Sequence, residues 1–108
     1  MSASDIARLN DALRSTGIGG QVVITHGIAG LHPTVQTGIA EKVRNFGNFT
    51  ADNDPHGEHD FGAFDFPGAA KVFWKIDYYD LTLTGGSENP ADPAQTTRVL
   101  TIMLAHEY

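Results

Sequence analysis

Residues 71–79, KVFWKIDYY, alternate between apolar and polar side chains, and this pattern most narrowly limits the possible folds. A period of two residues is that of a β-strand, whose successive side chains point to opposite faces of a sheet. Residues 59–66, HDFGAFDF, form a second strand-like run, and Pro67-Gly68 between the runs is typical of a turn. The two runs predict an antiparallel hairpin, with a loop of these two residues or of the next two as well.

The second of these strands has two different faces. The face that we expect in the core carries Val72, Trp74, Ile76 and Tyr78. The face that we expect to be more exposed carries Phe73, Lys75, Asp77 and Tyr79. An aromatic ring beside carboxylates suits the capture of a basic side chain from a partner, so Asp77, Tyr79 and the following Asp80 are candidate binding residues.

Two other segments show the three- and four-residue spacing of apolar side chains that is typical of amphipathic helices. The first covers residues 2–17, with Ser4 as a candidate N-cap and glycines at its end. The second begins at Pro33, which suits the first turn of a helix, and ends at Gly47. Residues 21–28, QVVITHGI, lie between them and are short and β-branched, which predicts a strand.

The last segment carries conflicting signals. Asp92, Pro93 and Gln95 suit the N-cap, first and third positions of a helix. The residues that follow are rich in Thr, Val and Ile, and their alternation over 98–104 suits a strand. We predict a helix over residues 93–108, because the start signals are specific, and a strand is the alternative.

These elements give the order α-β-α-β-β-α, which predicts a single α+β domain over residues 1–108. We expect a small antiparallel sheet with helices packed on it. A hydrophobic fraction of 41% is enough for one core in a chain of this length.

The sequence contains no cysteine, which excludes disulfides, zinc–thiolate sites and cysteine nucleophiles. The N-terminus lacks the basic and apolar regions of a secretory signal, and no apolar run approaches the roughly 20 residues of a membrane span. We therefore expect a cytoplasmic protein without membrane contact.

Charge is unevenly distributed along the chain. Residues 1–50 carry a balance of +1 and residues 51–108 a balance of −7, which gives the net charge of −6. Such an acidic half repels phosphate backbones, so we do not expect direct binding to nucleic acid. It would attract a basic protein surface, although acids also simply keep a small protein soluble.

Several linked motifs carry a family resemblance. NDPHGEHDFGAF, FWKIDYYD, GSENPADP and TTRVLTIMLAHEY resemble the bacterial family catalogued as domain of unknown function 3768, over most of the chain from about Leu9 to Tyr108. The resemblance implies no activity, cofactor or catalytic residue. Such proteins are typical of bacterial genomes rich in plasmids and phages, which implies a role on a mobile element.

Residues 50–62, TADNDPHGEHDFG, concentrate acids and histidines. The acids Asp52, Asp54, Glu58 and Asp60 are candidates for binding a basic partner. Asp52, Asn53 and Asp54 before a proline are also turn formers, so a purely structural polar loop explains the same residues. The sequence leaves both interpretations open.

A metal site is a further interpretation of this stretch. His56 and His59, with the neighbouring carboxylates, can hold a divalent transition metal such as zinc, nickel or iron if the loop curls. A calcium loop of the EF-hand type is excluded, because Ala63 stands where the bidentate glutamate is required. His56 and His59 remain the ligands of the alternative, metal-binding function.

No serine, histidine and carboxylate in the sequence form a recognisable catalytic motif. We therefore expect a non-enzymatic binding protein without a cofactor, a monomer or homodimer, that docks on a basic surface of another protein. One such partner is the nucleic-acid-binding surface of a defence complex. The protein would then be a mobile-element inhibitor of the anti-CRISPR or anti-restriction type. A metal-dependent enzyme and a structural subunit that pairs through an exposed strand edge are the alternatives.

Overall fold

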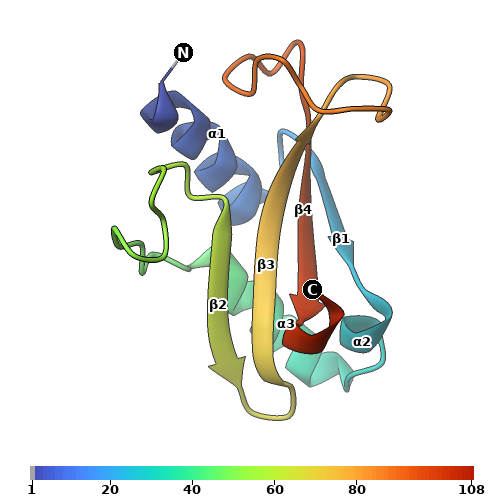
Figure 1. Cartoon of the computed structure of the whole chain (residues 1–108). Helices are drawn as coiled ribbons and strands as arrows, with labels where there is room; N and C mark the ends of the chain where they lie inside the picture. The colour runs from blue at the N-terminus through green and yellow to red at the C-terminus, as the bar shows by residue number, and fades with distance from the viewer. Residues whose placement is uncertain (1) are drawn as a thin grey trace.

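Four strands form one mixed sheet in the order β1-β4-β3-β2. The computed structural model describes residues 2–108, and Figure 1 shows the sheet with its helices. Along the chain the elements are α1 (Ala3–Thr16), β1 (Gln21–Ile24), α2 (His26–Ala29), α3 (Pro33–Arg44), β2 (Phe61–Phe66), β3 (Ala70–Tyr79), β4 (Thr97–Leu104) and the 3₁₀ helix η1 (Ala105–Glu107). The predicted α+β class is confirmed.

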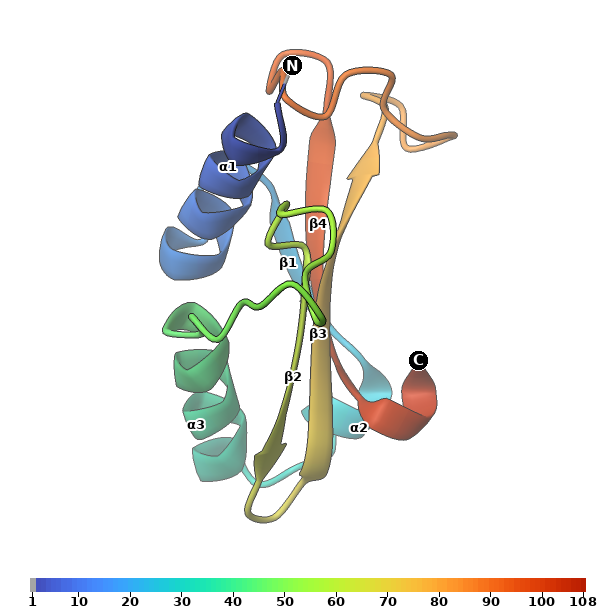
Figure 2. The same ribbon diagram turned by 60° about the vertical axis from the view of Figure 1, so that its left-hand side comes forward.

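The helices α1 and α3 lie end to end along one face of the sheet, as Figure 2 shows. The core fills the space between them and the sheet. Its fully buried side chains include Leu13, Ile39, Val72, Trp74 and Leu100. The opposite face has no long helix over it among residues 2–108, and η1 covers only its lower end.

The predicted hairpin is present as β2 and β3, which pair antiparallel from Phe61 opposite Lys75 to Phe66 opposite Ala70. Residues 67–69 form the loop, whose three-residue length lies between the two lengths that the sequence suggested. The alternation along β3 also matches the structure, because Val72, Trp74 and Ile76 are buried. The period-two pattern thus identified the core face of the sheet.

Three boundaries differ from the prediction. The helix α1 begins at Ala3 and is capped by Ser2, whose hydroxyl oxygen accepts a hydrogen bond from the backbone N–H of Asp5, rather than by Ser4. The strand predicted over residues 21–28 ends at Ile24, and its second half forms α2. The helix α3 begins at Pro33 as predicted but ends at Arg44, before Gly47.

The prediction of a helix over residues 93–108 is wrong, because the segment forms β4 and η1. The carboxylate of Asp92 does bond the backbone N–H of Ala94 and the side chain of Gln95, but these bonds close a turn. The β-branched residues beyond then fill the place between β1 and β3. Backbone bonds to two neighbouring strands outweigh the local helix signals.

The sheet is also not purely antiparallel as expected. β4 pairs antiparallel with β3 and parallel with β1, with Gln21 opposite Val99. This parallel pair leaves the short strand β1 at one edge of the sheet and β2 at the other. No helix in residues 2–108 is both long and apolar enough to cross a bilayer.

Candidate functional site: the acidic end

The connection between β3 and β4, residues 80–96, forms the upper end of the molecule in Figure 1. Its first turn continues the antiparallel pairing, because Tyr79 bridges to Gly86 and the backbone N–H of Ser87 donates to the carbonyl of Tyr78 at 3.0 Å. The backbone N–H of Asp80 donates to Gly85 O at 2.9 Å. Residues 80–86 therefore form a closed, hydrogen-bonded turn, which we call the 80–86 turn.

The carboxylate of Asp80 organises this turn from inside. It accepts hydrogen bonds from the backbone N–H groups of Thr82 and Thr84, at 3.1 and 3.0 Å, and from the Thr82 hydroxyl at 3.0 Å. These donors, the Thr84 N–H first, lower the pKa of Asp80 below its ordinary value. The turn is thus held by an ionised carboxylate at neutral pH.

Two leucines project from the 80–86 turn into solvent. Leu81 is 63% exposed and Leu83 is 50% exposed, and Leu83 has a left-handed backbone with φ of 61°. No lysine, arginine or histidine occurs from residue 80 to residue 97. Leu81 and Leu83 are therefore candidate contact residues for a partner.

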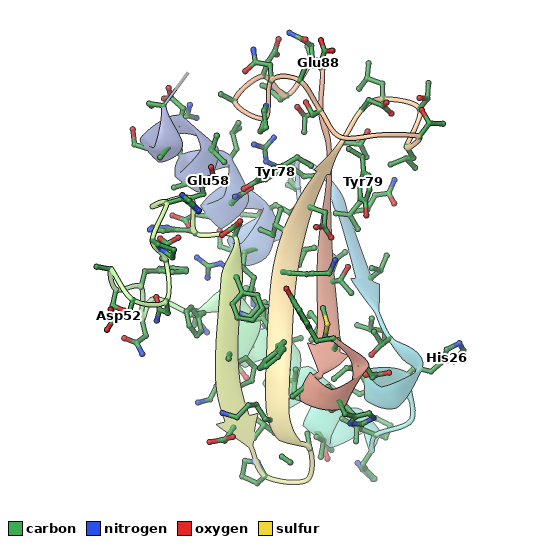
Figure 3. The ribbon with its side chains drawn as sticks, in the orientation of Figure 1. His26, Asp52, Glu58, Tyr78, Tyr79 and Glu88 are labelled. Carbon is green, nitrogen blue, oxygen red and sulfur yellow. The ribbon has the colours of Figure 1, made fainter. Side chains whose placement is uncertain are left out.

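Further carboxylates lie in the same upper part of the molecule. Glu88 lines, with Asp80, Leu81 and Gln95, a shallow hollow of about 320 Å³. Figure 3 shows Glu58 and Glu88 in the upper part of the molecule. We use the name acidic end for the five carboxylates that belong to residues 80–96 or to the segment that enters β2: Glu58, Asp60, Asp80, Glu88 and Asp92.

A buried polar network supports the acidic end from below. The Nε of Arg98, a side chain that is only 2% exposed, donates to the amide oxygen of Asn10 at 2.9 Å, and its Nη2 donates to the carbonyl of Pro90. The amide nitrogen of Asn10 donates to Tyr78 Oη at 2.8 Å and to the backbone carbonyl of Glu58 at 2.9 Å. The network ties α1, the 80–96 connection and the segment before β2 to one point.

Tyr78 and Arg98 are the titratable groups of this network. The Tyr78 hydroxyl donates to Glu58 Oε1 at 2.8 Å, and the Arg98 guanidinium lies 5.2 Å from the Tyr78 ring centre. Burial raises the pKa of Tyr78 well above its ordinary value and lowers the pKa of Arg98. Both groups keep their neutral-pH charge states and act as fixed supports.

Asp60 lies beside this network. Burial raises the pKa of its carboxyl group above the ordinary value, and the nearby Glu58 carboxylate raises it further. The Asp60 carboxylate therefore lowers the stability of the folded protein through desolvation and mutual repulsion with Glu58.

The other predicted acids are distributed differently. Asp52 is exposed and lies on the loop at the far left of Figure 3, away from Glu88. Asp54 is buried and accepts a hydrogen bond from the backbone N–H of His59 at 3.2 Å, so it holds the loop. Asp77 lies on the face of the sheet opposite α1 and α3, where it forms an ion pair with Lys75. Tyr79 shares that face, next to Asp80.

The two histidines of the metal interpretation do not share one environment. His56 is exposed. His59 stacks on the Phe49 ring at 3.9 Å, and its Nδ1 lies 3.0 Å from Asp11 Oδ1 while its Nε2 lies 3.6 Å from Asp54 Oδ2. Within residues 2–108, no three His, Asp or Glu side chains come together as a group that could hold a metal ion. Metal binding by His56 and His59 stays a prediction.

Another hollow, a shallow groove of about 610 Å³, lies between α3 and β2. Its apolar lining includes Phe46, Phe64 and Phe66, and Glu41 and Lys42 stand at its rim with opposite charges. The lining residues include no serine, threonine or histidine.

Sequence reasoning missed the roles of Asn10 and Arg98. An arginine in a strand and an asparagine in a helix carry no signal of burial in the sequence. The spacing of α1 does provide one clue, because Asn10 lies four and three residues from Ile6 and Leu13 on the apolar stripe. A polar residue on a buried stripe indicates a partner inside the core.

Residues 24–107 match the family described as protein of unknown function (DUF3768). The chain belongs to this family. The match covers most of the chain but begins at residue 24, so it does not include α1, which the resemblance had covered from about Leu9. Comparisons with curated proteins and with solved structures gave no match.

Proposed function

We propose that this DUF3768 protein is a non-enzymatic binding protein whose acidic end docks on a basic surface of another protein. The supporting observation is the 80–86 turn, which exposes Leu81 and Leu83 among carboxylates without a basic residue from 80 to 97. Leu81 and Leu83 together give an exposed apolar spot beside polar side chains, a feature that favours contact with a partner.

The two kinds of side chain have separate tasks in this proposal. Carboxylates such as Glu88 attract the basic partner and raise the rate of encounter, an effect that salt screens. Leu81 and Leu83 then lose their contact with water, and this burial of apolar surface favours the complex. Because Asp80 already orders the turn, binding has little loop entropy to overcome.

The partner class in this proposal is a nucleic-acid-binding protein of the bacterial cytoplasm. Its lysines and arginines are spaced to meet phosphates, and Glu58, Asp80 and Glu88 would meet them as phosphate substitutes. The corresponding biological role is a mobile-element inhibitor that blocks a defence complex of the CRISPR or restriction type. Asp77 and Tyr79, on the adjoining sheet face, would contact the margin of such a partner.

The test begins with tagged protein as bait in a bacterial lysate at about 50 mM NaCl, followed by identification and purification of the captured protein. The dissociation constant is then measured with the two purified proteins by calorimetry. We expect it to rise at least about tenfold at about 500 mM NaCl. The double variant Leu81→Ser with Leu83→Ser, and the single variant Glu88→Lys, should each weaken binding by about tenfold or more.

Matched controls carry the same changes away from the acidic end. Ile18→Ser replaces an apolar side chain that is 76% exposed, and Glu41→Lys reverses an exposed acid on α3. Both should bind like the unmodified protein, and circular dichroism should show the same fold for all variants. The proposal would be contradicted if neither salt nor the two acidic-end variants changed the affinity for the partner. It would also be contradicted if the control variants lost binding to the same extent.

A further inference from the structure

β1 is an edge strand whose outer backbone groups have no partner strand in the sheet. The N–H of Thr25 donates to Ile102 O at 3.2 Å, which fixes the side of the strand that faces β4. Because backbone groups alternate along a strand, the N–H and C=O groups of Val22 and Ile24 point away from β4. These four groups form a free hydrogen-bonding edge.

The side chains of this edge are apolar and exposed. Val22, Val23 and Ile24 are 48%, 41% and 47% exposed, and Ile18 just before the strand is 76% exposed. The strand QVVI is short, with four residues, but it contains no charge and no proline, which are other common means of protecting an edge from pairing. The other edge strand, β2, contains the exposed Asp65 and is followed at once by a proline.

The helix layer also leaves β1 incompletely covered. A hollow of about 260 Å³ lies between Ile24 and α3, and its apolar lining includes Ile28, Ile39 and Ile102. A second hollow of about 160 Å³ lies beneath Val22 and Leu100. Apolar side chains from another molecule at the edge would extend over both openings.

The position of β1 in the fold is firmly held. Glu107 accepts hydrogen bonds from the Thr25 hydroxyl at 2.6 Å and from the backbone N–H groups of Gly27 and Leu104, at 3.0 and 2.8 Å. These bonds attach the segment after β1 to the end of β4. The edge is thus a preformed template rather than a fraying strand.

Charge indicates which partner fits this edge. A chain with a net charge of −6 repels copies of itself wherever acids meet, but β1 carries no charge. A basic partner would gain nothing electrostatic from β1, whereas a second β1 matches it in both apolar character and backbone pattern. The edge therefore favours a second copy of the same chain.

We infer that β1 is the interface of a two-fold symmetric homodimer in which two β1 strands pair antiparallel. With Val23 on the two-fold axis, Val22 of each copy lies opposite Ile24 of the other. Because these two residues present their N–H and C=O groups outward, the pairing forms four backbone hydrogen bonds. The result is one continuous sheet of eight strands, with Val22 and Ile24 side chains meeting on the helix side.

Cysteine cross-linking tests this register directly, because the chain has no cysteine of its own. Residues opposite each other in a non-hydrogen-bonded antiparallel pair have Cα atoms about 4.5 Å apart, which is within reach of a disulfide. Val23→Cys should therefore give a covalent dimer under mild oxidation. Ala63→Cys, an exposed position on the other edge strand, should stay monomeric in a non-reducing gel.

Solution mass provides the second measurement. Light scattering from about 10 μM to about 1 mM should show the unmodified chain, of 11.6 kDa, approaching twice its own mass as concentration rises. Val23→Lys brings two like charges together on the axis and should stay monomeric, whereas Ala63→Lys should dimerise normally. Circular dichroism confirms that both variants fold, since both positions are exposed.

Three results would overturn the inference: a monomer at all concentrations, a Val23→Lys dimer, or open-ended growth into larger assemblies. A Val23→Cys chain that fails to cross-link while the unmodified chain dimerises would place the interface elsewhere. Because this test uses the purified protein alone, its failure leaves the proposed docking function unaffected. If the unmodified protein captures a lysate protein and Val23→Lys abolishes this capture, the β1 edge binds a different partner. That result would also contradict the homodimer.

Discussion

The acidic end and the β1 edge both expose large aliphatic side chains, but they differ in charge and in backbone bonding. Leu81 and Leu83 stand on a turn whose backbone is satisfied by Asp80 and by pairing with the end of β3. Val22 and Ile24 stand on a strand whose outward backbone groups are free and whose side chains carry no charge.

This difference shows that exposed apolar residues alone do not define a partner. Carboxylates around the leucines select a basic surface, and salt weakens that selection. The free strand edge selects another strand through backbone hydrogen bonds, which are insensitive to charge. One small domain can therefore hold two interfaces of different chemistry, and variants that damage one should leave the other intact.

The largest expected effect comes from the network beneath the acidic end. Arg98→Ala leaves a cavity and removes the hydrogen bonds to Asn10 and Pro90. We expect the free energy of unfolding to fall by about 3 kcal/mol. Urea denaturation measures this loss, and hydrogen exchange should show faster exchange of the Thr84 and Ser87 amides in the turn.

The control for this change is Arg44→Ala, which removes an exposed arginine at the end of α3. Its free energy of unfolding should stay within about 0.5 kcal/mol of the unmodified protein. If Arg98→Ala has an equally small effect, the network does not order the acidic end. If it prevents cross-linking of Val23→Cys while the protein stays folded, the two regions are coupled and the comparison fails.

The burial of Arg98 also marks a limit of sequence reasoning. The alternation that identified the inner face of β3 applies equally to β4, where Arg98 shares its face with Leu100 and Ile102. Local pattern would direct a charged residue to solvent, and only the distant Asn10 and Pro90 make burial acceptable. Such partners, brought together by the fold, leave no trace in a local window.

The hairpin and α3 could be predicted because their signals are local. Period-two alternation, a turn dipeptide and Pro33 each act within a few residues. The last strand was mispredicted because its start carries helix caps while its stability comes from two neighbouring strands. The acidic residues were selected by charge alone, which cannot distinguish the buried loop anchor Asp54 from the exposed Glu88.

A smaller effect is expected where β1 begins. Gly20 lies so close to β4 that a Cβ atom there would be 2.5 Å from the carbonyl oxygen of Arg98 and 2.9 Å from Leu13. The carbonyl is backbone and cannot move aside, so Gly20→Ala must push the start of β1 outward. We expect a loss of about 2 kcal/mol in unfolding free energy and weaker homodimerisation, with binding at the acidic end unchanged.

Gly47→Ala is the matched control, because a Cβ atom at Gly47 meets nothing within 4 Å. This variant should be neutral or slightly stabilising, since alanine restricts the unfolded chain. Denaturation and light scattering on the two alanine variants compare them directly. Equal behaviour of the two would mean that the contact between Gly20 and β4 does not position the edge.

The smallest effect concerns the electrostatic cost of the acidic end. The pKa of Asp60 is raised in the folded protein above its ordinary value of 3.8, so the folded state binds this proton more tightly than the unfolded state. The carboxyl group therefore costs stability as pH rises from about 4 through its folded pKa, and the cost is complete above that value. Protonation below pH 4 removes it.

Asp60→Asn should accordingly stabilise the protein at pH 7, by less than about 1 kcal/mol because the group is partly exposed. The gain should shrink toward zero as pH falls below about 4, since the native carboxyl then becomes neutral as well. Asp80→Asn should have the opposite sign at pH 7, because hydrogen bonds from Thr82 and Thr84 favour the ionised Asp80. Urea denaturation at a series of pH values measures both variants. If Asp60→Asn instead destabilises the protein at pH 7, the Asp60 carboxylate supports the fold. The acidic end would then have no electrostatic cost to stability, and in this respect it would not differ from the uncharged β1 edge.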